Sequence, residues 1–85
     1  MANYDIVFRR SALKDLRRFP GRDVALIMRA IEGLRVEPRP PQAQKLTDQE
    51  RWRLRKGRYR ILYEITDVQL IIIVVKIAHL KEAYG

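Results

Sequence analysis

Cysteine is absent from this 85-residue sequence, and histidine occurs only once. Without cysteine the chain forms no disulfide framework and offers no thiolate nucleophile. One histidine cannot build a histidine-rich zinc site, so we expect no metal and no cofactor. This composition is most simply that of a cytoplasmic protein.

Long apolar segments are missing as well. Residues 1–10 contain neither an apolar core segment nor the cleavage pattern of a signal peptide. The longest apolar run, Leu70 to Val75, is far shorter than the roughly 20 residues that a membrane-spanning helix needs. We therefore expect a soluble protein that is not exported and has no membrane partner.

Acidic residues are in the minority. The 18 Lys and Arg residues exceed the 10 Asp and Glu residues, which gives a formal net charge of +8. A basic balance of this size favours a polyanionic partner or an acidic protein. The length is sufficient for one modest core, so residues 1–85 are expected to form a single domain.

The first half of the chain predicts one strand followed by two helices. Residues 4–8 alternate in polarity, which is typical of a strand. Ser11 is the predicted N-cap of a short helix that stops at Pro20-Gly21. A second helix is expected from about Asp23, its predicted cap, to Leu34, because its apolar residues follow the spacing of one amphipathic face.

The second half predicts three antiparallel strands, at Arg51 to Arg55, Tyr59 to Thr66 and Gln69 to Ile77. The last of these is apolar on both faces, so it should lie centrally, with the first strand of the chain on its open side. The order of elements predicts an α+β fold. It has an N-terminal strand, a two-helix hairpin and three antiparallel strands, with the helices packed on one face of a four-stranded sheet.

Six cations lie within the ten residues from Arg51 to Arg60, around a break at Gly57. Because successive side chains of a strand point to opposite faces, five arginines share one face of the predicted hairpin. They are Arg51, Arg53, Arg55, Arg58 and Arg60. A solvated outer face is the alternative, but such a face usually mixes signs, and residues 51–60 contain no acid. Like charges side by side destabilise a hairpin, so this surface is suited to holding phosphates.

The same alternation assigns the aromatic side chains of the hairpin to the helix side. Trp52, Tyr59 and Tyr63 are therefore expected to pack in the core rather than to stack on bases. Lys76 interrupts the apolar strand, where an unpaired ammonium is expensive to bury. We expect it on the open face beside the arginines, with an ion pair to Glu64 as the alternative. The acids of the helical segments are expected to be ordinary surface charges: Asp15, Asp23, Glu32 and Glu37.

One block of the hairpin carries a family likeness, namely Arg53-Leu54-Arg55-x-Gly57-x-Tyr59-Arg60-Ile61-Leu62-Tyr63-Glu64-Ile65. Together with the order of elements and the closing Lys81-Glu82-Ala83-Tyr84, it resembles the RelE/ParE superfamily of bacterial and archaeal toxins. The likeness covers nearly the whole chain. It implies the toxin of a type II toxin-antitoxin system, kept inactive by a cognate antitoxin that covers the basic sheet or the helical hairpin.

In RelE-type members the implied activity is cleavage of messenger RNA on the ribosome, by attack of a ribose 2′-hydroxyl on the neighbouring phosphate. By this resemblance, Arg60 neutralises the scissile phosphate and Tyr84 helps to position the reacting nucleotide. Arg51 and Arg53 match basic site residues that are often lysine in other members, with Arg53 in the catalytic set, and Arg55 matches a further basic strand position. The RNA-binding surface is completed by Lys56, Arg58 and Lys76.

Two departures from the family pattern bear on catalysis. Arginine is a poor general base, so arginines in place of lysines weaken any mechanism in which one of them accepts the 2′-hydroxyl proton. Many members also carry a basic pair before the tail tyrosine, where this chain has His79-Leu80. Either Lys81 or His79 substitutes for the missing arginine, or cleavage is weak or absent. Histidine is the side chain best suited to proton exchange near neutral pH.

Three functions are compatible with these residues. The first is a metal-independent endoribonuclease that cleaves mRNA on the ribosome. The second is a non-enzymatic toxin of the ParE branch that inhibits DNA gyrase, which Leu80 favours, whereas the dense basic strand pair favours RNA. The third is a catalytically weakened homologue that still binds antitoxin or nucleic acid. In each case the expected protein partner is a cognate antitoxin, and DNA is contacted only indirectly, through the antitoxin complex.

Overall fold

The structure is a computed structural model that describes residues 3–46 and 50–83. The elements within these ranges are β1 (Asp5–Phe8), α1 (Arg10–Arg17), α2 (Gly21–Gly33), β2 (Ala43–Lys45), β3 (Arg51–Lys56), β4 (Tyr59–Thr66), β5 (Ile71–His79) and α3 (Leu80–Ala83). The predicted α+β class is confirmed. The sheet has five strands rather than the four predicted, because the short strand β2 is added at one edge.

The strands lie in the order β1-β5-β4-β3-β2. β1 runs parallel to β5, and every other neighbouring pair is antiparallel. As predicted, β5 lies inside the sheet, with β1 and β4 on its two sides. β2 pairs with β3 through only three residues, which is too short a segment for alternation in the sequence to reveal.

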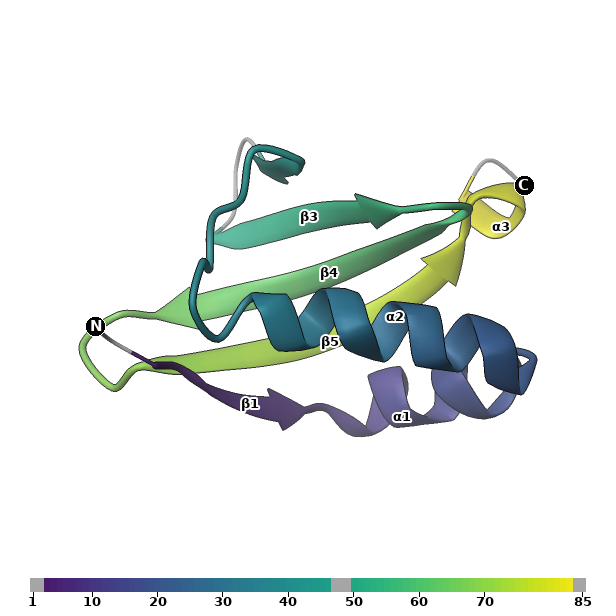
Figure 1. Cartoon of the computed structure of the whole chain (residues 1–85), viewed down its shortest axis with the longest axis horizontal. Helices are drawn as coiled ribbons and strands as arrows, with labels where there is room; N and C mark the ends of the chain where they lie inside the picture. Colours follow the sequence, from purple (N-terminus) through teal and green to yellow (C-terminus); the bar gives the residue numbers. More distant parts are fainter. Residues whose placement is uncertain (1–2, 47–49, 84–85) are drawn as a thin grey trace.

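The two helices form a hairpin in which α2 crosses one face of the sheet and α1 lies along β5, beyond the end of β1 (Figure 1). Both predicted N-caps are wrong. Ser11 lies inside α1, and its hydroxyl donates to the carbonyl oxygen of Val75 at 2.6 Å. Asp23 lies in the first turn of α2, and its carboxylate accepts a hydrogen bond from the Tyr59 hydroxyl at 2.6 Å. In both cases a partner in the sheet replaces the local cap.

The core lies between α2 and the sheet. Ile27 and Ile31 of α2 and its C-cap Leu34 are at most 1% exposed, and each buried side chain of this size contributes about 1.5–3 kcal/mol. They meet apolar residues of the three central strands: Leu54, Tyr59, Ile61, Tyr63, Ile72, Val74 and Ile77. The prediction that the hairpin aromatics pack on the helix side is confirmed for these two tyrosines, and Trp52 packs against the same cluster.

Tyr63 is fully buried, and its hydroxyl donates to the carbonyl oxygen of Pro38 at 2.7 Å. Burial raises the pKa of the Tyr63 phenol to about 12. The bond ties the loop after α2 to the centre of the sheet. That loop leads directly into β2, so the same contact helps to place the edge strand.

A bulge in β5 decides which face Lys76 occupies. Tyr63 pairs with Val74 and Leu62 pairs with Lys76, so Val75 is an extra residue between two adjacent residues of β4. Under strict alternation Lys76 would share the buried side of Val74. The bulge reverses the alternation and turns Lys76 to the face away from α2, as predicted, where it is exposed.

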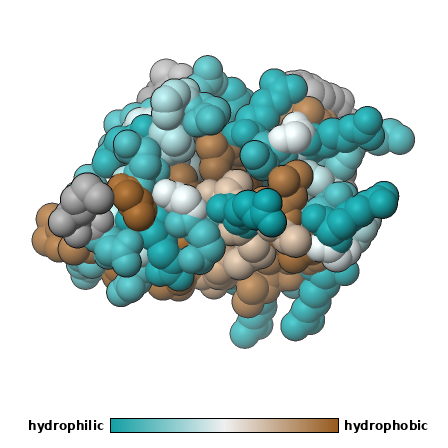
Figure 2. Space-filling model, in the orientation of Figure 1, coloured by the Kyte–Doolittle hydropathy of each residue, from teal (hydrophilic) through white to brown (hydrophobic). Residues whose placement is uncertain are grey.

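The α2 side of the molecule keeps some apolar surface. Figure 2 views this side and shows hydrophilic side chains projecting around the outline, with apolar patches between them. Leu13 of α1 is 46% exposed and Leu26 of α2 is 36% exposed. Scattered apolar residues of this kind are normal on a protein surface, so this side suggests no site by itself.

Candidate functional site

The candidate site is the face of the sheet opposite α2, which we call the open face. Its central residues are Arg53 and Arg55 of β3, Arg60 and Leu62 of β4, and Lys76 and Ala78 of β5. The strand register places Arg60 between Arg55 on one side and Ala78 on the other. The small side chain of Ala78 leaves space beside the Arg60 guanidinium.

Two adjoining hollows lie on the open face. One has a volume of about 150 Å³ and is lined by Gln42, Gln44, Arg53, Arg55 and Arg60. The other has a volume of about 320 Å³ and is lined by Leu46, Arg53, Arg60, Leu62, Lys76 and Ala78. Arg53 and Arg60 line both, so three of the five arginines predicted to share a face surround one continuous region together with Lys76. Arg51 and Arg58 line neither hollow.

The charges of this region are of one sign, since no acidic residue is among the described residues that line either hollow. Arg55 and Arg60 are directly opposed in the β3–β4 ladder, an arrangement that destabilises an antiparallel pair. Arg53 is oriented by a neutral partner, because its guanidinium donates to the side-chain oxygen of Gln44 on β2. A bound anion would relieve the repulsion between these groups.

Arg51 lies at the opposite end of β3 and has a different environment. Its Nε donates to the Glu64 carboxylate at 3.1 Å, and Arg9 approaches the other oxygen of that carboxylate at 3.7 Å. The predicted arginine face therefore contains one compensated charge, because Glu64 offsets the charge of Arg51 at this end.

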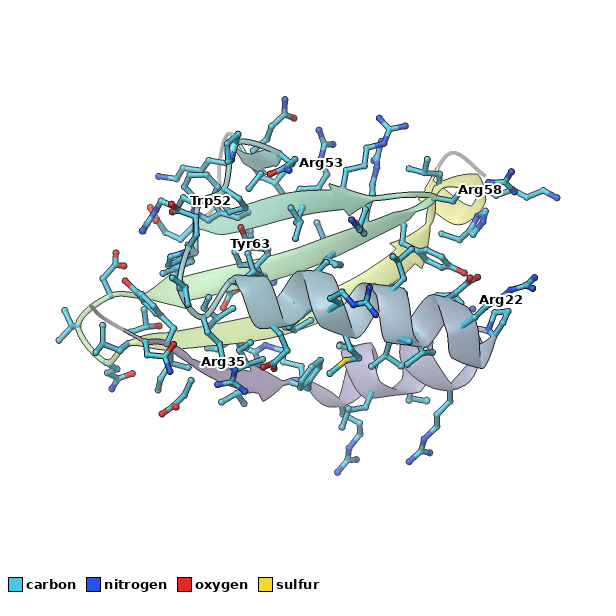
Figure 3. All side chains as sticks on the ribbon, viewed as in Figure 1. Arg22, Arg35, Trp52, Arg53, Arg58 and Tyr63 are labelled. Atoms are coloured by element: carbon cyan, nitrogen blue, oxygen red, sulfur yellow. The ribbon has the colours of Figure 1, made fainter. Side chains whose placement is uncertain are left out.

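Lys56 and Arg58 are exposed where β3 turns into β4. Gly57 in this turn has a φ of +57°, a backbone conformation that glycine adopts without strain. The strand predicted to end at Arg55 continues by one residue, since Lys56 ends β3 and the turn consists of Gly57 and Arg58. Figure 3 shows Arg58 beside α3 and Arg53 farther along β3.

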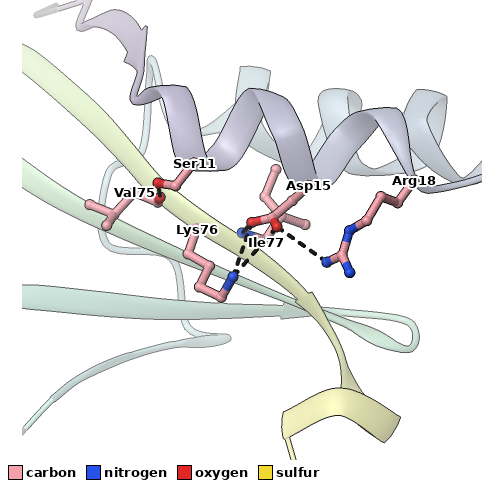
Figure 4. A network of polar contacts seen from close by, with 6 residues as sticks. All are labelled: Ser11, Asp15, Arg18, Val75, Lys76 and Ile77. Carbon is pink, nitrogen blue, oxygen red and sulfur yellow. Dashed lines mark hydrogen bonds and ion pairs between the residues drawn. The ribbon is translucent and has the colours of Figure 1, made fainter.

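Lys76 extends toward α1, where its Nζ lies 3.4 Å and 3.5 Å from the two carboxylate oxygens of Asp15 (Figure 4). The alternative partner, Glu64, is occupied by the two arginines described above. The prediction that Asp15 is an ordinary surface charge is wrong, because Asp15 is only 5% exposed. Its carboxylate also accepts from the backbone N–H of Ile77 at 3.0 Å and from Arg18 at 3.2 Å.

His79 and Lys81 are not among the residues that line the hollows of the open face. His79 pairs with Tyr59 on the helix side, and the two rings meet edge to face at 5.2 Å. Its Nδ1 accepts the backbone N–H of Lys81 at 3.0 Å, so the ring proton of the neutral imidazole is on Nε2. Both residues line a separate cleft of about 470 Å³ with Arg18, Phe19, Pro20, Asp23 and Tyr59. Tyr84 lies outside the described residues.

Among the described residues, no group of three or more His, Cys, Asp or Glu side chains could hold a metal ion. No helix in the described ranges is long and apolar enough to cross a membrane. The lining of the open face offers fixed positive charge and hydrogen-bond donors, arranged over a solvent-accessible hollow.

Residues 6–84 match the family described as the ParE toxin of the type II toxin-antitoxin system parDE. The chain belongs to this toxin family. The match spans nearly the whole sequence and supports membership in the wider RelE/ParE superfamily. No curated protein matches the sequence.

Solved structures of RelE-type toxins share the fold of this ParE-family chain. The toxin-antitoxin complex RelBE2 from Mycobacterium tuberculosis matches at 27% identity with a TM-score of 0.82, covering 92% of this chain and 99% of that chain. The RelB-RelE complex from Methanococcus jannaschii matches at 25% identity, TM-score 0.74, with 93% and 95% coverage. The YoeB/ParE toxin from Agrobacterium tumefaciens, at 18% identity and TM-score 0.76, covers 88% of this chain and 96% of that chain and shows likeness of fold alone.

Sequence reasoning missed two contributions to the site of this ParE-family toxin. Gln44 lies on the unpredicted strand β2, and its partner Arg53 could be named only once the register of β2 against β3 was known. Asp15 is one acid among five cations in residues 9–18, and that contrast in charge was the available signal. Neither side chain is identifiable as part of a basic surface from strand alternation alone.

Proposed function

We propose that this ParE-family toxin is a ribosome-dependent endoribonuclease that cleaves mRNA on the open face of its sheet. The observation that carries the proposal is the convergence of Arg53, Arg55 and Arg60 on one hollow without an acidic residue among its described lining. Phosphoryl transfer needs mainly positioning and fixed positive charge around the phosphate oxygens, and guanidinium groups supply both at any cellular pH.

In the proposed reaction the ribose 2′-hydroxyl gives up its proton to solvent as its oxygen bonds to the adjacent phosphorus, and the bond from phosphorus to the 5′-oxygen breaks. The leaving 5′-oxygen takes up a proton from solvent, which produces a 2′,3′-cyclic phosphate and a 5′-hydroxyl. Arg60 faces the phosphate from the centre of the site, with Arg55 opposite it in the ladder. Arg53 and Lys76 border the same space. Arginine is a poor proton acceptor, so these groups contribute charge and orientation rather than general-base catalysis.

The proposed protein partner is a cognate antitoxin. The RelBE2 and Methanococcus jannaschii structures are complexes of toxins with their antitoxins. The formal charge of +8 favours an acidic partner segment, and the basic open face gives such a segment a surface on which to exclude RNA. Antitoxin binding in this position would inhibit the toxin by competition.

Inhibition of DNA gyrase is the second candidate function. Two observations favour it: the family match carries the ParE description, and Leu80 stands where RelE-type relatives often have arginine. A leucine cannot stabilise an anion or protonate a leaving oxygen. In this alternative the basic open face binds an acidic protein surface and performs no chemistry.

One experiment separates the two functions. The purified toxin is incubated with translating ribosomes and an mRNA whose cleavage sites are mapped, and in parallel with gyrase and relaxed plasmid. Cuts in phase with codons support the endoribonuclease, whereas blocked supercoiling without cuts supports the gyrase inhibitor. If the toxin produces neither cuts nor blocked supercoiling, it is a homologue that retains only binding. Arg22 is an exposed arginine of α2 that lies away from Arg53 in Figure 3. Arg22→Ala is therefore the control for the loss of one charge in the site variant Arg60→Ala.

A further inference from the structure

The exposed surface of α1 carries charge of one sign. Residues 9–18 contain five cations and a single acid, Asp15, which is buried. Lys14 is three and four positions from Arg17 and Arg18, spacings at which like charges on a helix repel each other. A solvated helix surface usually mixes signs, so this concentration indicates an anionic ligand.

Three of these five cations border a cleft of about 460 Å³, which is lined by Ser11, Lys14, Asp15, Arg17, Arg18 and Lys76. Four cations and one carboxylate give this lining a formal charge of 4 − 1 = +3. Lys76 also lines the larger hollow of the open face, together with Arg53 and Arg60. The cleft on α1 and the open face are therefore connected through one lysine.

The two regions meet where β5 has no strand on the side away from β4. β1 pairs with β5 only from Ile71 to Val74, and α1 takes its place alongside the remainder of β5. Ser11 and Asp15 bond to the backbone of β5 there, at Val75 and Ile77. A ligand on the open face can pass over this edge without crossing another strand.

Asp15 does not oppose an anion in the cleft. Its carboxylate is buried and receives donors from the Ile77 backbone, Arg18 and Lys76 (Figure 4). The same contacts hold Arg18 and Lys76 at the border of the cleft, and their side chains remain 54% and 50% exposed. The carboxylate thus fixes two cations at the point where the two surfaces join.

We propose that RNA bound on the open face continues across the edge of β5 at Lys76 and places further backbone phosphates against Lys14, Arg17 and Arg18. This inference rests on the proposed function for the identity of the ligand. No aromatic residue is among the described residues that line the α1 cleft, so bases have no stacking platform there. The contacts are to phosphate, and they add affinity without reading sequence.

The test measures the affinity of the free toxin for fluorescein-labelled, single-stranded RNAs of roughly 12 and roughly 4 nucleotides over a range of salt concentrations, lengths that bracket the sites of many single-strand-binding surfaces. The variant is the double substitution Lys14→Glu and Arg17→Glu. The matched control is Arg22→Glu with Arg29→Glu, the same charge change at two exposed positions of α2. Circular dichroism verifies that both variants are folded.

The proposal predicts that the α1 variant binds the longer RNA about tenfold more weakly than the control variant does, and loses about 0.7 of salt-dependence slope for each phosphate contact removed. Binding of the short RNA should change equally in both variants, because a short strand reaches only the open face. Equal loss in both variants for the long RNA would overturn the α1 path. A toxin that shows the α1 effect but never cuts mRNA refutes the endoribonuclease function and leaves this path intact.

Discussion

Asp15 and Ile77, 62 positions apart in the chain, are joined by a hydrogen bond of 3.0 Å from the backbone N–H of Ile77 to the buried Asp15 carboxylate. This bond replaces the partner that a neighbouring strand would supply, because β1 has already ended. The same carboxylate also forms an ion pair with Lys76, the residue before Ile77. One side chain of α1 therefore closes the sheet edge and fixes a cation of the candidate site.

Asp15→Ala should lower the free energy of unfolding by about 1–3 kcal/mol, because the buried N–H of Ile77 loses its acceptor. Asp15→Asn should cost less, since an amide oxygen can still accept from that N–H. Urea denaturation at neutral pH measures both. Equal destabilisation by the two variants would show that charge, rather than the bond to Ile77, holds α1 to β5. The ion pair with Lys76 adds little in either case, because that lysine is half exposed.

Arg60→Ala should reduce mRNA cleavage on the ribosome by about 100-fold or more, the usual effect of removing one group that stabilises charge in a transition state. Arg51→Ala should have a much smaller effect, because Arg51 is paired with Glu64 at the other end of the strand. Cleavage rates are measured with saturating ribosomes and compared with wild type. Similar losses in the two variants would mean that cleavage depends on the net charge of the protein and not on a specific contact of Arg60 with the phosphate.

Strand alternation was enough to predict which residues of β3 and β4 face away from the helices, because Arg53 and Arg60 follow an uninterrupted period of two. Alternation alone gives the wrong face for Lys76, because the bulge at Val75 reverses the period of two in β5. The cost of burying an ammonium group was what gave the correct face. The burial of Asp15 was not predictable, because it depends on where β1 ends relative to β5. The residues around Asp15 do not reveal the register of β1 against β5, because that register is set by residues far away in the sequence.

Leu80→Arg tests whether the cation that the resemblance to RelE-type toxins leads us to expect at this position is needed here. Leu80 begins α3, and its backbone N–H donates to the carbonyl oxygen of Arg58 at 2.7 Å, a bond that does not depend on the side chain. The substitution should therefore preserve the fold and keep or raise mRNA cleavage, with Leu80→Met as the uncharged control. A clear loss of cleavage in the arginine variant alone would indicate that Lys81 or His79 already fills that role.

Asp67, in the turn between β4 and β5, should make the stability of the fold depend on acid pH. Arg39 donates to the Asp67 carboxylate at 2.8 Å, and the Tyr4 hydroxyl donates to it at 2.7 Å. These two bonds hold the pKa of Asp67 below its ordinary value. A carboxyl with a depressed pKa in the folded state stabilises the fold above its unfolded pKa, near 4. This contribution is lost as the pH falls through the lower, folded value.

The melting temperature of the wild type should therefore decline between pH 5 and about pH 3 more steeply than that of Asp67→Asn, whose amide does not titrate. The difference should be small because the Asp67 side chain is 56% exposed, and it should shrink in about 1 M salt, where screening extends over only ~3 Å. Thermal melts of both proteins at matched pH and salt provide the measurement. Parallel curves at low salt would show that Arg39 and Tyr4 hold the turn without help from the charge of Asp67.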